Sequence, residues 1–379
     1  MKKLAVLKIY PELNVGDDLF LSILLDRYSE VDFYLLANKS MYNKFIHEHP
    51  NLKIIDTLQN INLFDRLLLK LSTYFSESVQ ERVFKDYVKK QYGEKLLNTD
   101  FFVTIGGSMF IENKNDKINR SLLFYQVINT AFKNKPRYFI GCNFGPYYSD
   151  NFLNNFKVIL GEATDLSFRD RESEDILKLP NLRINPDIVF GFKVETIPHK
   201  IPNSVGFVLV DPRIKMPNLE ISYSHYVSEI QKLIGKYINN GSNVTLFSYC
   251  KKENDEVLIN DVLAQKELLN KNINVVKYEG ELNSFIDQYS KMEMVFCGRF
   301  HSMILSMLFD QRMLPLIYSK KMTNILEDIN FSGDVVELNS LNSEEHERYL
   351  QMARNNRYNI EELKKSANCH FEKIDQLIK

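Results

Sequence analysis

The sequence predicts an α/β protein built from two doubly wound, Rossmann-like domains that face a cleft. Short runs of β-branched and aromatic residues alternate with longer amphipathic segments in the first half of the chain, and the same alternation starts again in the second half. The chain of 379 residues is also too long for one core, because single domains commonly have about 100 to 200 residues.

The first half of the chain contains a series of predicted strands, each followed by a loop or a helical pattern. These strands are 4–10, 31–37, 52–56, 100–105, 137–142 and 165–168. Between the first two strands, Leu19, Phe20 and Ile23 lie on one face of a predicted helix. The pattern therefore predicts an N-terminal α/β domain over residues 1–197.

The second half repeats this pattern after a predicted linker, KVETIPHKIPNS, which has two prolines and few apolar residues. Its predicted strands are 205–210, 243–249, 273–278, 292–298 and 314–318. We therefore expect a C-terminal α/β domain over residues 203–340. A charged, helical segment is expected over 342–379. Ligands of such sheets bind beyond the carboxyl ends of the strands, so the loops there are the candidate sites.

Composition narrows the classes of function. The 48 basic and 49 acidic residues give a net charge of -1, so no overall field attracts nucleic acid, and any anion site must be local. The four cysteines are widely spaced, which predicts reduced thiols and no metal site. The opening MKKLAVLKIY predicts a strand rather than a signal peptide, and no apolar run is long enough for a membrane span. We expect a cytoplasmic protein without stable membrane insertion.

The stretch VFCGRFHSMI, residues 295–304, is the strongest candidate site in the second half. A predicted strand ends there, and Arg299 and His301 fall in the turn before an apolar helix. Free backbone N–H groups and the helix dipole favour an anion at such a turn. The structural alternative is that Arg299 is a surface residue and that His301 only begins a helix.

Two loops of the first half could contribute to the same chemistry. In SFRDRES, Arg169 ends a strand and Asp170 is expected to cap the next helix. In NVGDD, Asn14 and Gly16 form a tight turn. Asp17 there repels phosphate, so this loop favours hydroxyl binding, although a capping role for Asp17 is the alternative.

Other candidates also follow predicted strands. Gly106 and Gly107 in TIGGSMF permit close approach of a ligand to the backbone, and Ser108 follows them. Asn143 in CNFGP points to the same edge, while Lys321 in YSKKMTNIL would add positive charge near Arg299.

Taken in order, these motifs resemble the polysaccharide pyruvyl transferase family. The set is NVGDD, TIGGSMF, CNFGP, SFRDRES, NPDIVF, GRFHSMI and YSKKMTNIL, from about residue 14 to 326. The sequence departs from the family pattern at Ser108, which is the third residue of a glycine triplet, and at Phe300, which replaces a leucine. Neither departure removes a charged group.

The resemblance implies a GT-B-like fold and an enzyme that uses phosphoenolpyruvate to place a pyruvate ketal on a sugar. The acceptor would belong to a cell-surface polysaccharide or to its lipid-linked precursor, which would bring the protein to the inner membrane face. The resemblance also implies that Arg299, His301 and Arg169 line the donor site. No cofactor is expected beyond the donor substrate.

The chemistry of this reaction suits these residue types. Phosphoenolpyruvate carries close to three negative charges at neutral pH, because the second phosphate pKa is about 6. Guanidinium groups can bind both its carboxylate and its phosphate. Ketal formation needs a proton on the enol methylene carbon, and a histidine with a usual pKa of about 6.5 is a suitable donor.

Two other functions are compatible with the same residues. A GT-B glycosyltransferase would use a nucleotide sugar, with its diphosphate at the same helix terminus. A non-catalytic scaffold of polysaccharide assembly would bind an anion without turnover. The acceptor sugar and the oligomeric state, including a homo-oligomer, are also left open by the sequence.

Overall fold

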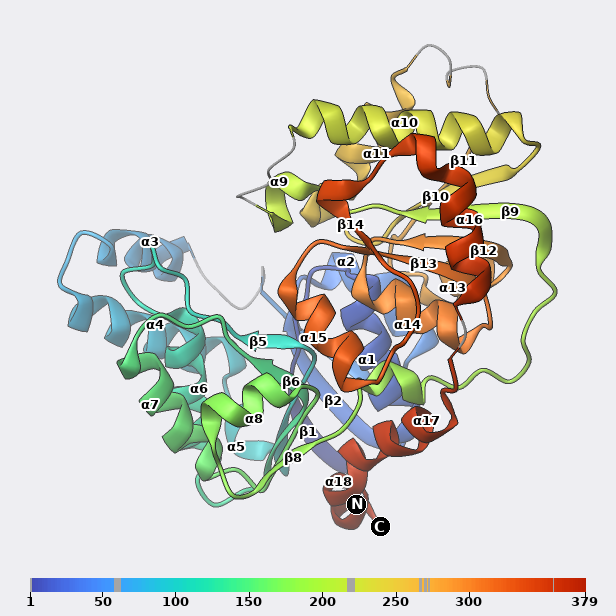
Figure 1. Ribbon diagram of the computed structural model, residues 1–379. Coiled ribbons are helices and arrows are strands. Elements are labelled where there is room, and N and C mark those ends of the chain that lie inside the picture. The colour runs from blue at the N-terminus through green and yellow to red at the C-terminus, as the bar shows by residue number, and fades with distance from the viewer. Residues whose placement is uncertain are drawn as a thin grey trace. The chain divides into compact units, whose positions relative to one another are not determined.

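The computed structural model of the protein describes residues 2–57, 63–216, 222–265, 268, 271, 273–356 and 358–379, without the side chains of Lys215 and Lys321 (Figure 1). The chain forms two compact units. Unit 1 comprises Met1–Pro11, Phe20–Ile188 and Ser366–Lys379, and unit 2 comprises Glu12–Leu19 and Val189–Lys365. The loop Glu12–Leu19, which the sequence assigns to the first domain, therefore groups with unit 2.

Unit 1 is organised around a parallel sheet. Its described strands are β1 (Lys3–Lys8), β2 (Val31–Ala37), β3 (Leu52–Asp56), β4 (Phe101–Ile105), β5 (Ser108–Phe110), β6 (Arg137–Phe144), β7 (Asp165–Phe168) and β8 (Leu182–Ile184). The order across the sheet is β3-β2-β1-β4-β6-β7-β8, with β5 paired to β6. This is a doubly wound order, and the direction of winding reverses between β1 and β4.

Helices cover the faces of this sheet, with α3 on the outer side of α4 (Figure 1). They are α1 (Val15–Arg27), α2 (Lys39–Glu48), α3 (Leu63–Ser72), α4 (Glu77–Tyr92), α5 (Lys95–Asn98), α6 (Arg120–Ala131), α7 (Asp150–Gly161), α8 (Arg171–Leu177) and α18 (Glu372–Ile378). Because helices cover the sheet, every residue of the central strand β6 is buried. The core contains a cluster of aromatic rings, among them Phe102, Phe110, Tyr125 and Phe139.

Unit 2 has the same kind of parallel sheet. Its described strands are β9 (Ile201–Val208), β10 (Asn243–Ser248), β11 (Asn274–Lys277), β12 (Met292–Cys297), β13 (Arg312–Ile317) and β14 (Val336–Glu337). The order is β11-β10-β9-β12-β13-β14, so the winding reverses between β9 and β12. At that point Phe207 and Phe296 stack with ring centroids 4.6 Å apart.

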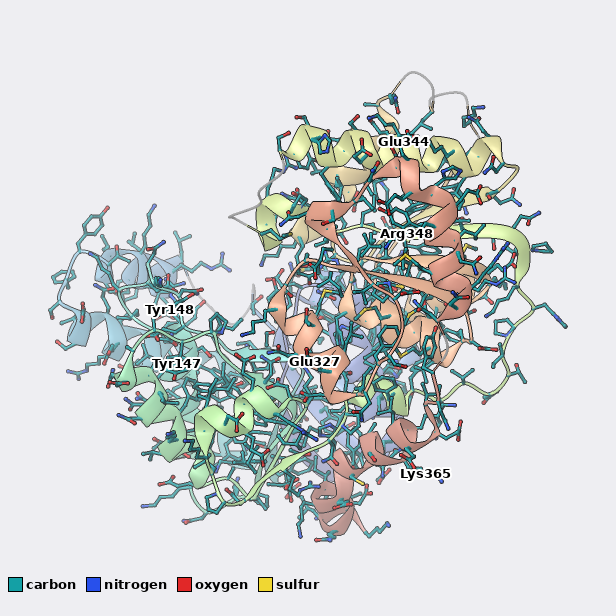
Figure 2. The ribbon with its side chains drawn as sticks, in the orientation of Figure 1. Tyr147, Tyr148, Glu327, Glu344, Arg348 and Lys365 are labelled. Atoms are coloured by element: carbon teal, nitrogen blue, oxygen red, sulfur yellow. The ribbon has the colours of Figure 1, made fainter. Side chains whose placement is uncertain are left out.

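The described helices of unit 2 connect these strands, except for α16, which follows the last strand. They are α9 (Pro212–Lys215), α10 (Tyr223–Asn239), α11 (Asp255–Leu263), α13 (Leu282–Ser290), α14 (Phe300–Leu308), α15 (Lys320–Asp328) and α16 (His346–Asn355). The segment 342–379, expected to be helical, contains α16, α17 (Glu361–Asn368) and α18, and its residues from Ser366 onward belong to unit 1. Figure 2 labels Glu344 and Arg348 in this segment, and Glu344 pairs with Lys236 of α10 at 2.7 Å.

The predicted strands agree closely with the observed ones. β2, β3 and β7 have the predicted bounds. The predicted linker is wrong at its end, because β9 already begins at Ile201, which pairs with Met292 of β12. No helix in the described part of the chain combines the length and the apolar character that crossing a membrane requires.

Candidate active site

The first cluster of candidate residues lies in unit 2, at the carboxyl end of β12. This strand ends at Cys297, and Arg299 is the residue that precedes α14. The backbone N–H of Arg299 donates to Ser302 Oγ at 3.4 Å, which helps to fix the first turn of the helix. His301 is half-buried in that turn, and its ring contacts the ring of Phe300 edge-on at 5.3 Å. The predicted strand–turn–helix context of Arg299 and His301 is therefore confirmed.

Arg299 is buried and ion-paired. Its Nη1 donates to Glu253, and its Nη2 donates to Asp255. Asp255 is almost fully buried, and it also accepts the backbone N–H groups of Tyr249 and Cys250, both at 2.9 Å. Glu253 is more accessible than Asp255. The alternative of a plain surface arginine is thus excluded.

The charge of Arg299 is strongly held. Burial alone would lower the pKa of this guanidinium, but the charges of Asp255 and Glu253 outweigh burial and raise the pKa above its usual value. The side chain is therefore a permanent cation. Its Nε has no hydrogen-bond partner among the described atoms.

The start of α1, with Asn14 just before it, meets this turn within unit 2. Asn14 Oδ1 accepts the backbone N–H of Gly16 at 3.0 Å, which shapes the turn. A Cβ atom added to Gly16 would collide with the imidazole ring of His301, so the ring lies directly on the glycine backbone. Asp17 lies in the first turn of α1. Asp18, beside it, is fully buried and accepts the hydroxyl of Tyr278 at 2.7 Å.

This contact gives a prediction for Gly16→Ala. The added methyl group should lower the free energy of unfolding by about 1–3 kcal/mol, because it overpacks the site against His301. In a His301→Ala background the same change should cost much less, since the ring is gone. Urea denaturation of the four proteins measures this coupling. An equal cost in both backgrounds would show that the two residues are not in contact.

The second cluster lies in unit 1, at the carboxyl ends of β4, β6 and β7. Arg169 follows β7 and is buried. Its Nη1 pairs with Asp187 at 2.5 Å, and its Nη2 donates to Asn143 Oδ1 at 3.0 Å. A Cβ atom on Gly107 would collide with the guanidinium group. The glycine therefore allows the TIGGSMF loop to lie against Arg169.

Neighbouring residues complete this cluster. Asp170 caps α8 by accepting the backbone N–H of Ser173 at 2.7 Å, so the predicted cap is confirmed. Ser108 is exposed, and its hydroxyl lies 3.5 Å from Asn143 Oδ1. Gly106 has a φ of 127°, a conformation that side chains rarely permit.

The structure thus groups the predicted residues into two sets. Arg299, His301, Asn14, Gly16 and Asp17 belong to unit 2. Arg169, Gly106, Gly107, Ser108 and Asn143 belong to unit 1. The backbone of Lys321 lies in α15, but its side chain lies outside the described part of the protein.

The charged partners of the two arginines were missed by sequence reasoning. Glu253 and Asp255 are 46 and 44 residues away from Arg299, and no motif connects them to it. Asp187 could have been predicted as a site residue, because it lies in the NPDIVF motif. Asp18 follows Asp17 in NVGDD, where two acidic residues at a helix start gave no sign that one of them is buried.

Comparisons with known proteins agree with these motifs. A family model described as polysaccharide pyruvyl transferase matches residues 14–320. This range includes both clusters and the acidic partners of the two arginines. A search of the curated proteins found no match to the sequence.

Solved structures show the fold. UDP-GlcNAc 2-epimerase from Methanocaldococcus jannaschii has a TM-score of 0.59 and 12% identity, covering 99% of this chain and 100% of that chain. Anabaena Alr3699/HepE with UDP and glucose has a TM-score of 0.56 and 10% identity, covering 100% and 98%. Arabidopsis thaliana UGT89C1 with quercetin has a TM-score of 0.56 and 12% identity, covering 100% and 99%. The predicted GT-B-like class of two Rossmann-like domains is confirmed.

Proposed function

Because the chain belongs to the polysaccharide pyruvyl transferase family, we propose that it moves the enolpyruvyl group of phosphoenolpyruvate onto a sugar. The acceptor is a sugar of a surface polysaccharide or of its lipid-linked precursor, and the product is a pyruvate ketal. The observation that carries the proposal is the arrangement in unit 2. His301 follows the buried cation Arg299 by two residues, and its ring lies on the backbone of Gly16.

Arg299 is proposed to bind the donor anion through an exchange of partners. Asp255 is tied to two backbone N–H groups, so it stays in place. Glu253 is the more accessible carboxylate, with 14% of its side chain exposed against 1% for Asp255. A phosphate or carboxylate of phosphoenolpyruvate offers the same bidentate geometry to a guanidinium group. The donor therefore replaces Glu253, and Asp255 keeps the arginine oriented.

His301 is proposed as the acid. Its proton goes to the enol methylene carbon, which becomes a methyl group and leaves an oxocarbenium-like centre at the next carbon. One sugar hydroxyl attacks this centre and releases its proton. The bond from that carbon to the phosphate oxygen then breaks, inorganic phosphate leaves, and a second hydroxyl closes the ring with loss of its proton. One of the two hydroxyl protons restores His301 and the other is taken up by the phosphate, so the reaction consumes only the donor and the acceptor diol.

The remaining predicted residues are proposed as substrate contacts. Arg169, held by Asp187, supplies a second fixed guanidinium for the donor. Gly106, Gly107, Ser108 and Asn143 lie around it. In unit 2, Asn14, Gly16 and Asp17 are proposed to contact acceptor hydroxyls. Lys321 is proposed to add positive charge for binding the donor.

The test compares donors. We expect phosphate release from phosphoenolpyruvate when the polysaccharide and lipid fraction of the producing cell supplies the acceptor, and no nucleoside diphosphate release from UDP-sugars. In the same assay Arg169→Met should raise the phosphoenolpyruvate concentration needed for half-maximal rate. Nucleoside diphosphate release without phosphate release would identify a glycosyltransferase. Binding of phosphoenolpyruvate without turnover would identify a scaffold.

A second candidate function, nucleotide-sugar transfer, is favoured by one feature. A pocket of about 440 Å³ lies beyond β13 in unit 2, and its lining includes Tyr318, Ser319, Asn339 and Glu327, the last labelled in Figure 2. Structures similar to this chain were solved with UDP or UDP-GlcNAc. The donor assay above decides between this candidate and the pyruvyl transferase.

A further inference from the structure

Helix α3 of unit 1 turns its apolar side outward. Leu63, Leu67 and Leu71 recur at every fourth residue and form one row, while Phe64 and Leu68 form the row beside it. All five side chains are exposed, with Leu63 at 85% and Phe64 at 63%. A surface helix normally directs such a stripe to the core. In α3, by contrast, the apolar side faces away from the core.

The inner side of α3 carries Asp65, the half-buried Leu69 and the buried Ser72. Ser72 is buried, and its hydroxyl donates to the carbonyl of Leu69 at 2.8 Å. Asp65 forms an ion pair with Lys90 of the neighbouring helix α4, with 2.6 Å between the charged atoms. Figure 1 shows α3 on the outer side of α4, at the edge of unit 1. The Asp65–Lys90 ion pair therefore joins α3 to α4, while the five exposed leucine and phenylalanine side chains lie on the other side of the helix.

The exposed apolar surface continues past the end of the helix. Tyr74 is 83% exposed and Phe75 is exposed as well. The cations Arg66 and Lys70 lie on α3 beside the leucine rows, and both are exposed. The α3 patch is defined here as Leu63, Phe64, Leu67, Leu68, Leu71, Tyr74 and Phe75. A contiguous apolar patch of this kind marks an interaction site.

We propose that the α3 patch docks on the surface of an anionic lipid bilayer. A helix with leucine and phenylalanine on one side and cations at its flank lies in the plane of a membrane interface. Tyrosine is enriched at the headgroup level of such interfaces. Arg66 and Lys70 complement anionic headgroups, and Asp65, the acidic residue of α3, is held by Lys90.

A bilayer fits this patch better than a second protein chain does. Stable protein interfaces use roughly 20 to 30 residues on each side, whereas the apolar patch is limited to one helix and the turn after it. A bilayer makes no demand for a complementary shape. The proposal is independent of the reaction proposed above. Where that reaction also holds, docking brings the enzyme to a lipid-linked acceptor.

The chain contains no tryptophan, so a single one reports on its own surroundings. Phe64→Trp should give a blue-shifted emission on addition of phosphatidylglycerol vesicles, and little shift with phosphatidylcholine vesicles. The matched control is Val158→Trp on α7, also in unit 1 and also exposed, whose emission should not change. A shift that is absent from the Phe64→Trp variant, or equal in the two variants, overturns the proposal.

Vesicle co-sedimentation of the full chain gives the second readout. Leu67→Ser with Leu71→Ser should weaken binding to phosphatidylglycerol vesicles by about tenfold for each leucine, because less apolar area enters the interface. Arg66→Gln with Lys70→Gln should weaken binding at low salt, and the difference from the original chain should shrink as salt rises, because salt screens the attraction to the headgroups. Binding that persists in the leucine variant overturns the proposal. Self-association that the leucine variant abolishes, without vesicle binding by the original chain, also overturns it and identifies a second copy as the occupant.

Discussion

Replacing His301 by glutamine is expected to lower turnover by about 10²- to 10⁴-fold, the usual contribution of a general acid. Glutamine keeps hydrogen-bonding groups but cannot deliver a proton to the enol carbon. The half-buried ring lies on Gly16, so its position is fixed by the fold rather than by a flexible loop. Phosphate release under saturating phosphoenolpyruvate measures the effect.

The matched control for this prediction is His225→Gln. His225 is an exposed histidine of α10 in the same unit, and its replacement should leave turnover unchanged. Stabilisation by phosphoenolpyruvate should survive in His301→Gln, because the anion is bound mainly by guanidinium groups. Near-normal turnover of His301→Gln would contradict the acid role.

Arg299→Ala is expected to have the largest effect on stability. Removing one partner of a buried ion pair typically costs about 3–5 kcal/mol, because the other charge stays buried without compensation. In this variant Asp255 would remain almost fully buried. It would keep its two backbone N–H donors but would lose the positive charge that balances it. The free energy of unfolding in urea measures this cost. A loss below about 1 kcal/mol would show that the ion pair is not formed in solution, since that is the range of exposed pairs.

A companion variant separates binding from stability. Glu253→Gln leaves the contact between Arg299 and Asp255 intact and removes the carboxylate that we propose the donor replaces. Phosphoenolpyruvate should therefore bind more tightly to Glu253→Gln than to the original chain. Glu256→Gln is the control, because Glu256 belongs to the same segment but pairs with Lys277 at 3.2 Å. Weaker binding to Glu253→Gln would show that Glu253 supports the site and does not compete.

Much of the fold was predictable because apolar runs of four to eight residues stand between clear turn signals. The strand at 165–168 was found in this way, although it has only four residues. The strands β5, β8 and β14 were missed, since two or three residues form too short a pattern and their pairing depends on neighbours far along the chain. Only pairing with β12 makes Ile201 part of a strand.

The sequence was sufficient to predict which loops carry the candidate residues. Strand ends located Arg299, His301 and Arg169. Gly107 was expected to admit a ligand, whereas the structure places the guanidinium group of Arg169 against it. The burial of the arginines was not predictable. It depends on acidic residues from other loops, and a sequence gives no sign of which carboxylate will meet which guanidinium.

Binding of phosphoenolpyruvate at Arg299 can be measured by a thermal-shift titration. The original chain should melt at a temperature that rises with the phosphoenolpyruvate concentration, as for any ligand that binds only the folded state. Arg299→Ala should melt lower and gain almost nothing from the ligand, while inorganic sulfate serves as the control for general anion effects. No rise in the original chain, or an equal rise in both proteins, would show that phosphoenolpyruvate does not bind at Arg299.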